Sequence, residues 1–318
     1  MLQILSQNSQ EIRSIPKGLE FESNAIWYDL INPEPDEVCA IEQTLGIHVP
    51  SLAEISEIEE SSRLFEDKGV LYMAAILIAS ADSGTTVMVP TTFIVTQKNV
   101  VTVRYNELKA FQIFIKKIFR NEFLTSQRLF LGLIDTIVER TADILELNSA
   151  EIDMISNEIF KDHRSSDSRE LKEILIHIGK TGSLNSKVRE SLVTIDRLLN
   201  FYSNQLPDTI DKKNLDKVVS LQKDVKSLVN YVSFLFSKIE FLLDATLGFI
   251  DIEQNGIIKF FSVAAVIFLP PMVIASVYGM NFALIPELRW VWGYPFALVL
   301  MFLSAVLPYY YFKRKGWL

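Results

Sequence analysis

The chain has a single cysteine, Cys39, and three scattered histidines among its 318 residues. One cysteine excludes an intrachain disulfide and fits a reducing compartment. We expect Cys39 to be a small buried apolar residue rather than a reactive thiol. These residues do not have the spacing of metal ligands, so no zinc or iron cluster is predicted. There is also no phosphate-binding loop and no nucleophile with a neighbouring base, so we expect no enzyme and no organic cofactor.

Basic residues are outnumbered by acidic ones, and the net charge is −8. This balance argues against a nucleic-acid partner. The chain does not start with an apolar segment behind a basic end, the pattern of a secretory signal. About the first 250 residues are therefore expected to stay on the side of the membrane where they are made.

Proline is absent over two long stretches, one between Thr125 and Pro207 and one between Pro207 and Pro270. The first stretch predicts a helical hairpin, because a polar segment near residues 161–168 divides two runs of helical apolar spacing. The second predicts one continuous helix of roughly 90 Å, three times the thickness of a bilayer. Two helices hinged near Gly248 or Gly256 are the alternative.

Charge is nearly absent from two apolar runs of about 20 residues, each long enough to cross a hydrocarbon layer of about 30 Å. Residues 257–277 carry one charge, Lys259, and residues 291–312 carry none. Lys313, Arg314 and Lys315 follow the second run, which places the C-terminus in the cytosol. Two spans then place the N-terminus there as well.

The fold class predicted is an α+β cytosolic domain with a long helical hairpin, followed by a very long helix that enters the membrane and a second transmembrane helix. In the first domain, strands rich in Val, Ile and Thr are expected at 25–30, 70–79, 86–96 and 100–104, in one mostly antiparallel sheet. Helices are expected at 36–45, 51–60 and 108–120. The predicted parts are residues 1–124 (cytosolic α/β domain), 125–208 (cytosolic hairpin), 209–256 (cytosolic part of the long helix), 257–277 (first span), 278–290 (external loop), 291–312 (second span) and 313–318 (cytosolic basic tail).

Two spans cannot enclose an aqueous path, so conduction requires several copies around an axis. Four polar residues of the long helix fall on one stripe about 60° wide, at about 100° per residue. These are Asp244, Asn255, Ser262 and Ser276, with Leu269 between them. Gly248, Ile252, Ile258, Ala265 and Met272 flank this stripe on its two sides. Either this stripe lines a pore or its serines pack helix against helix.

Between the spans, residues 278–282 read Tyr-Gly-Met-Asn-Phe, and residues 285–290 read Ile-Pro-Glu-Leu-Arg-Trp. With two C-terminal spans, these motifs resemble the CorA family of divalent-cation channels. Residues 311–318, Tyr-Phe-Lys-Arg-Lys-Gly-Trp-Leu, resemble the gamma-proteobacterial branch of that family. The similarity is densest over residues 244–318 and extends weakly through residues 27–30 and 57–63.

The resemblance implies a funnel-shaped homopentamer in the bacterial inner membrane that carries Mg²⁺, and also Co²⁺ or Ni²⁺, into the cytoplasm. Gly279, Met280 and Asn281 would form the selectivity filter, where the Asn281 oxygen holds the hydrated ion through its waters. The pore positions implied by the resemblance are Asn255, Ile258, Leu269, Met272 and Asn281. Met272 stands where some members have a smaller polar residue, which puts a polar role at that level in doubt.

The family also implies that cytosolic Mg²⁺ between protomers closes the channel. Asp135, Glu139 and Asp143 form an i, i+4 stripe and are the first regulatory metal ligands we consider. Asp216 and Asp224 on the long helix are alternatives. Asp244 would form a ring of carboxylates that attracts cations at the inner mouth.

Two rival functions remain open at this point. The first is a zinc transporter of the same superfamily, against which Met280 argues because relatives with other middle residues tend to carry zinc. The second is a two-span membrane sensor whose cytosolic domain signals to a partner. A polar stripe through the first span argues against the sensor, since an anchor needs none.

Overall fold

The computed structural model describes residues 2–6, 12–15, 25–55, 63–79, 86–118, 125–161, 168–205, 211–281 and 290–316. The chain folds as two compact units. The first comprises Met1–Arg164 and Lys172–Leu242, and the second comprises Ser165–Leu171 and Leu243–Leu318. The first unit holds the sheet and the helical bundle, and the second holds the two most apolar helices.

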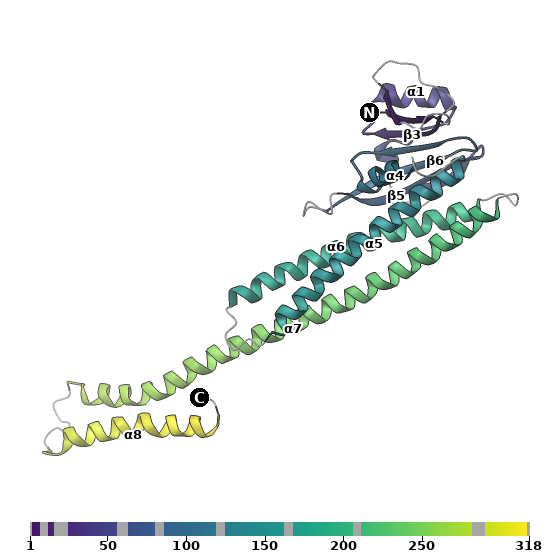
Figure 1. The fold of residues 1–318 in the computed structure, drawn as a ribbon. Coiled ribbons are helices and arrows are strands. Elements are labelled where there is room, and N and C mark those ends of the chain that lie inside the picture. The colour runs from purple at the N-terminus through teal and green to yellow at the C-terminus, as the bar shows by residue number, and fades with distance from the viewer. Residues whose placement is uncertain are drawn as a thin grey trace. The chain divides into compact units, whose positions relative to one another are not determined.

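The first unit contains one sheet of seven strands, in the order β2-β1-β3-β7-β6-β5-β4. Figure 1 labels β3, β5 and β6 of this sheet. All neighbours are antiparallel except β3 and β7, which pair in parallel. This confirms the mostly antiparallel sheet. The strands are β1 Leu2–Ser6, β2 Ile12–Ile15, β3 Ala25–Ile31, β4 Leu64–Asp67, β5 Val70–Ala79, β6 Val87–Val95 and β7 Val100–Arg104. The sequence did not predict β1, β2 and β4.

The short helices are α1 Pro35–Leu45, α2 Leu52–Ile55 and α4 Lys109–Ile118, each within or close to a predicted helix. Residues 56–60 and 119–120 of the predicted helices lie outside the described residues. The capping box at Ser51 is present, because the Ser51 backbone N–H donates to Glu54 Oε2 over 2.6 Å. Cys39 is exposed, so the expectation that it is buried was wrong. The buried face of α1 carries Ile41, and Cys39 lies off that face, where its Sγ accepts from Gln43.

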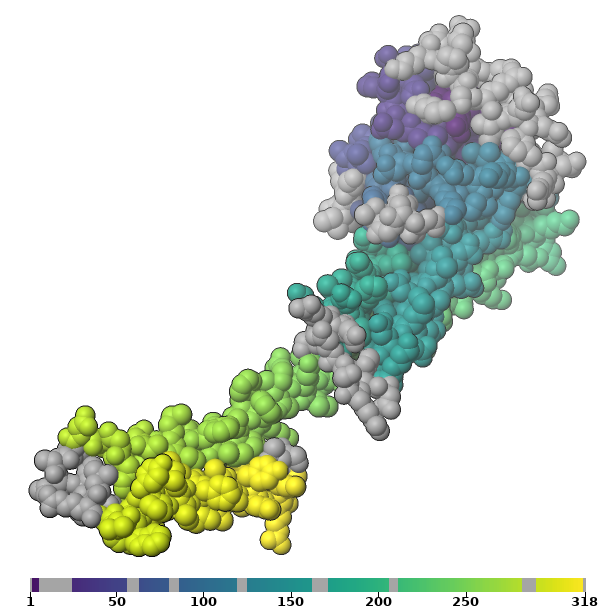
Figure 2. Space-filling view, turned by 60° about the vertical axis from the view of Figure 1, so that its left-hand side comes forward, coloured from purple at the N-terminus to yellow at the C-terminus, as the bar shows by residue number. Residues whose placement is uncertain are grey.

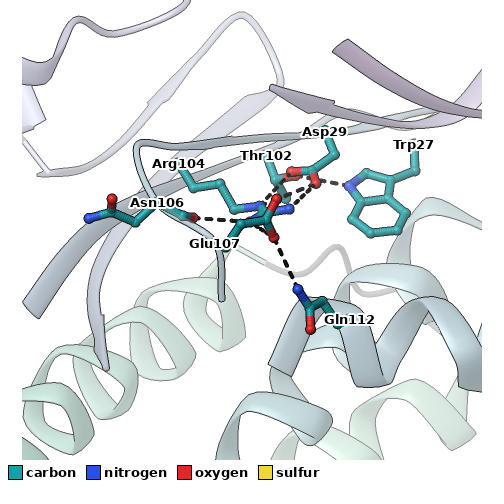
Figure 3. A network of polar contacts seen from close by, with 7 residues as sticks. All are labelled: Trp27, Asp29, Thr102, Arg104, Asn106, Glu107 and Gln112. Carbon is teal, nitrogen blue, oxygen red and sulfur yellow. Dashed lines mark hydrogen bonds and ion pairs between the residues drawn. The ribbon is translucent and has the colours of Figure 1, made fainter. Parts of the chain in front are cut away.

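A polar network is buried where β3 and β7 pair in parallel (Figure 3). Arg104 Nη2 lies 2.9 Å from Asp29 Oδ2, and both side chains are almost fully buried. Thr102 donates to Asp29 Oδ1 over 2.6 Å and accepts from Trp27 Nε1 over 3.0 Å. Burial raises the pKa of the Asp29 carboxyl, an effect that the charge of Arg104 opposes. Trp27 and Asp29 belong to the weak part of the resemblance, and here they are structural residues.

Two long helices continue the first unit, α5 Ser126–Ile159 and α6 Ser168–Asn204. They confirm the predicted hairpin helices, while most of the predicted turn, residues 162–167, lies outside the described residues. α6 is attached to the sheet at Thr194, whose hydroxyl accepts from the Ile76 backbone N–H over 3.0 Å. Ile76 lies opposite Pro90 and beyond the four β5 residues that pair with β4. Thr194 therefore bonds a part of the β5 edge that β4 does not cover.

The longest element is α7, which runs without interruption over 67 residues, Lys212–Tyr278. Asp211 precedes it, and its side chain accepts from the Lys213 backbone N–H over 3.3 Å. The continuous helix is confirmed, and there is no break at Gly248 or Gly256. The last helix, α8, covers Gly293–Arg314, close to the predicted second span.

Candidate ion pathway

The second unit consists mainly of two helices, the end of α7 and α8, both long and apolar enough to cross a membrane. Figures 1 and 2 both show α8 alongside the end of α7. Only 6% of the most apolar stretch of each helix is buried. Apolar side chains that the chain itself leaves uncovered require another apolar environment, either lipid or further copies of the chain.

One face of the α7 span is shielded inside this unit. Val263 is only 3% exposed, and Ile267, Ile274 and Tyr278 at helical spacing from it are partly covered. On α8 the two buried residues are Gly293 and Ala297. Small residues let two helices approach closely within a membrane. We conclude that α8 packs on the Val263 face of α7.

The predicted pore residues lie on the other side of the α7 span. By helical geometry their mean direction is roughly 160° from that of the shielded residues. Ile258, Leu269 and Met272 are between 54% and 62% exposed. Asp244, Asn255, Ser262 and Ser276 are also exposed, and Gly248 is partly covered. The serines therefore do not pack against α8, which removes that part of the helix-packing alternative.

One residue on this stripe, Asp251, was not predicted from the sequence. Asp251 lies seven residues after Asp244 and four before Asn255, and its side chain is exposed. The same helical spacing that selected the other residues would have found it. Asp244 and Asp251 give the stripe two levels of negative charge before the uncharged Asn255.

The Gly-Met-Asn motif begins directly after the last residue of α7. The Gly279 N–H donates to Ala275 O over 2.9 Å, and the Met280 N–H donates to Val277 O over 3.3 Å. A Cβ at Gly279 would lie 3.2 Å from Ala275 O, so the absent side chain permits this close turn. Asn281 is exposed. Residues 282–289, with the predicted Ile285–Trp290 motif up to Arg289, lie outside the described residues.

The proposed regulatory carboxylates are each placed beside a base of the same chain. Asp135 Oδ1 lies 2.7 Å from Lys217 Nζ, Glu139 pairs with Lys117, and Asp143 lies 3.8 Å from Arg140. Asp216 and Asp224 are exposed on α7. Among the described residues, no group of three Asp, Glu, His or Cys side chains is arranged to hold a metal ion. The described residues of one copy therefore do not supply a complete set of ligands for a metal at these carboxylates.

The model of the CorA-like Mg²⁺ transporter proteins matches residues 22–314, most of the chain. The chain belongs to this family. Two relatives, both named magnesium transport protein CorA, come from Escherichia coli and Haemophilus ducreyi. They are 35% and 34% identical over 300 residues, which is 93% of this chain and 92% and 93% of the relatives. Membership confirms the family that the Gly-Met-Asn motif indicated, and it confirms a transporter rather than an enzyme.

The CorA fold is also found by comparison of structures. The CorA magnesium transporter from Methanocaldococcus jannaschii superimposes with a TM-score of 0.77 at 19% identity. The match covers 100% of this chain and 99% of the archaeal chain. It confirms the predicted fold class, an α/β domain with long helices, a very long apolar helix and a C-terminal span.

Proposed function

We propose that several copies of this chain form a channel that carries Mg²⁺ into the cytoplasm of a bacterium. The observation that carries the proposal is the exposed stripe from Asp244 to Ser276 on the side of α7 away from α8. Two relatives of nearly full coverage are named magnesium transport proteins, which supports Mg²⁺ as the substrate. The chain would span the inner membrane twice, with both termini in the cytoplasm, as Lys313–Lys315 favour.

The proposed assembly is a homopentamer, which the family resemblance implies. One α7 from each copy would line the path, and the Val263 face would stay against α8 of the same copy. Met272 and Leu269 would make apolar levels that exclude water in a closed state. Asn255 would offer amide oxygens, and Asp244 with Asp251 would attract cations to the cytosolic mouth.

At the other mouth, Asn281 would select the ion. Mg²⁺ holds its first water shell strongly, so a neutral ring of amide oxygens can bind those waters without stripping them. Carboxylates there would hold the ion too firmly for rapid release. A divalent cation gains about 4.6 kcal/mol for every 100 mV on entering a negative-inside cell. The membrane potential therefore supplies the driving force without nucleotide hydrolysis.

The direct test is Mg²⁺ uptake into proteoliposomes by the full chain and by Asn281→Ala. Each lost hydrogen bond to the hydrated ion costs about 1 kcal/mol. A ring of such losses should reduce uptake by about tenfold or more. The matched control is Asn230→Ala, an exposed asparagine of the first unit, which should leave uptake unchanged. Normal uptake by Asn281→Ala would refute the filter.

The same vesicles separate the two rival functions. Zn²⁺ uptake that exceeds Mg²⁺ uptake under one imposed potential would identify a zinc transporter. Absence of any divalent flux, in vesicles where the protein is correctly inserted, would favour the membrane sensor. We expect Mg²⁺ uptake to dominate, with Co²⁺ and Ni²⁺ as competing ions.

A further inference from the structure

The C-terminal turn of α8 combines exposed aromatic and basic side chains. Tyr309, Tyr310 and Tyr311 are 39%, 65% and 57% exposed. Lys313 and Arg314 end the helix and Lys315 follows it, all three exposed. From residue 288 to residue 318 the sequence has no Asp or Glu. This end of α8 therefore carries three positive charges with no acidic side chain nearby in the sequence.

Two of the ammonium groups lie against tyrosine rings one turn earlier. Lys313 Nζ is 5.9 Å from the centre of the Tyr309 ring, and Lys315 Nζ is 5.4 Å from that of Tyr311. Each pair has i, i+4 spacing, which places its two side chains on one side of the helix, and the two pairs lie on different sides because they are offset by two residues. Within the described residues, no ion pair is formed by Lys313, Arg314 or Lys315. Within the part of the chain that the structure describes, these charges lie beside the rings without a carboxylate partner.

The opposite, N-terminal end of α8 also has exposed aromatic residues. Trp290, Trp292 and Tyr294 are between 53% and 76% exposed. No charged residue occurs from residue 290 to residue 312. Aromatic rings at both ends match the two interfaces of a bilayer. Only the C-terminal end of the described helix adds a cluster of cations, so the two interfaces offer different chemistry to the headgroups.

We propose that Lys313, Arg314 and Lys315 form a binding site for the phosphate of anionic phospholipid headgroups, with Tyr309–Tyr311 lying at the glycerol level of the same lipids. This rests on the proposed insertion of α8 across the membrane. Lys and Arg donate charge-assisted hydrogen bonds to phosphate oxygens, and tyrosine is stable at the boundary between acyl chains and water. The exposed rings directly beside the bases favour a lipid over a free phosphate ion, because a free phosphate ion has no apolar part that could contact the rings.

The expected strength follows from the number of bases. Each Lys or Arg near an anionic surface contributes about fivefold in affinity, so three together contribute about 100-fold. The attraction should weaken as salt is raised, because such charges are screened within about 10 Å at 0.1 M. Replacing Lys by Arg at Lys313 and Lys315 should keep the binding, because the charge and the phosphate-bonding groups remain.

The test uses the full-length protein in nanodiscs of phosphatidylcholine with a minor fraction of phosphatidylglycerol. Native mass spectrometry after release from the discs counts the phosphatidylglycerol molecules retained per chain. The test variant is K313Q/R314Q/K315Q, and K313R/K315R is the conservative variant. The matched control is K172Q/K180Q/K223Q, which removes three exposed charges from the first unit.

We expect K313Q/R314Q/K315Q to lose phosphatidylglycerol selectivity, while the other two variants keep it. Equal retention by K313Q/R314Q/K315Q and the parent protein would overturn the proposal, as would displacement of the lipid by millimolar inorganic phosphate. Protease accessibility of the C-terminus confirms that each variant is inserted in the same orientation. Mg²⁺ uptake is measured separately, so loss of transport with lipid still bound would count against the proposed function and not against the lipid site.

Discussion

At the scale of single residues, the buried ion pair of Asp29 and Arg104 carries a large free-energy cost of desolvation. Besides its contact with Asp29, Arg104 Nη1 donates to Asn106 O over 3.0 Å and lies 3.3 Å from Glu107 Oε2 (Figure 3). The guanidinium also lies over the Phe111 ring. Burying two charges is expensive, and their attraction offsets this only when their remaining hydrogen bonds are made. Here they are made, so removal of one partner should cost more than removal of both.

We predict that Arg104→Met destabilises the protein by about 3–5 kcal/mol at neutral pH, because Asp29 is left as an uncompensated buried charge. Asp29→Leu with Arg104→Met should cost clearly less. The exposed pair Arg128–Asp211 provides the control, and Arg128→Met should cost less than about 1 kcal/mol. Thermal unfolding of the purified protein in detergent measures all three. An Arg104→Met loss no larger than that of Arg128→Met would contradict the prediction.

The pH dependence of Arg104→Met follows from the Asp29 carboxyl. Burial already raises its pKa in the folded protein, and loss of the guanidinium raises it further. The folded state then binds the proton more readily than the unfolded state. The stability contribution is therefore fully present below the ordinary carboxyl pKa of about 4 and is lost as pH rises through the folded pKa. The deficit of Arg104→Met relative to the parent should shrink at acidic pH, and a constant deficit would exclude this cause.

The contact between Asp29 and Arg104 could not be predicted from the sequence. The motif at residues 27–30 was recognised only as a family feature, and nothing in its spacing revealed that Asp29 meets Arg104. The two lie 75 positions apart and are brought together by the parallel pairing of β3 with β7. Parallel pairing depends on the path of the whole chain, which local periodicity does not report. The same limit explains why the partners of Asp135 and Glu139 were not foreseen.

At the scale of elements, the sequence predicted the long helices and the regular strands well. Absence of proline and sustained helical spacing identified α5, α6 and α7, while runs of β-branched residues identified β5, β6 and β7. The three missed strands are short, at four or five residues each. β4 also ends in Glu66-Asp67, which are poor strand formers. Such strands form because a neighbouring strand offers backbone hydrogen bonds, which is a property of the sheet.

The continuity of α7 leads to a prediction about its two central glycines. A Cβ at Gly248 or Gly256 would meet nothing within 4 Å. Gly248→Ala and Gly256→Ala should each stabilise the helix by about 1 kcal/mol, because alanine loses less conformational entropy on folding. Mg²⁺ uptake by Gly256→Ala, which lies off the proposed pore stripe, should be retained, since no hinge is present at this position. Impaired uptake with a raised unfolding temperature would instead show that bending there is needed for conduction.

At the scale of the whole molecule, the carboxylates on α5 bear on how copies assemble. Asp135, Glu139 and Asp143 each lie near a base of their own chain, and all are at least partly exposed. A Mg²⁺ ion between copies would have to compete with these bases and take further ligands from the neighbour. We keep these residues as the first proposed regulatory site and Asp216 with Asp224 as the second.

The prediction is that Asp135→Ala, Glu139→Ala and Asp143→Ala together abolish the protection from protease that Mg²⁺ gives to the assembled protein. Exposed ion pairs contribute about 0–1 kcal/mol each, so the chain should still fold. Asp216→Ala with Asp224→Ala is the parallel variant and should leave protection intact. The reverse pattern would move the regulatory site to α7. Unchanged protection in both variants would remove both sites.

Conduction as proposed requires that copies of α7 enclose water along the face opposite Val263, and cysteine accessibility along that helix tests this most directly. Cys39 is the only cysteine, so Cys39→Ser supplies a thiol-free background. Single cysteines at each position from 258 to 276 are then treated with a charged thiol reagent in proteoliposomes. We expect reactivity to rise and fall with a helical period, high at Ser262, Leu269 and Ser276 and low at Val263 and Ile274. Reactivity that peaks on the Val263 face, or that is equally low on both faces, would contradict a water-filled path at this stripe.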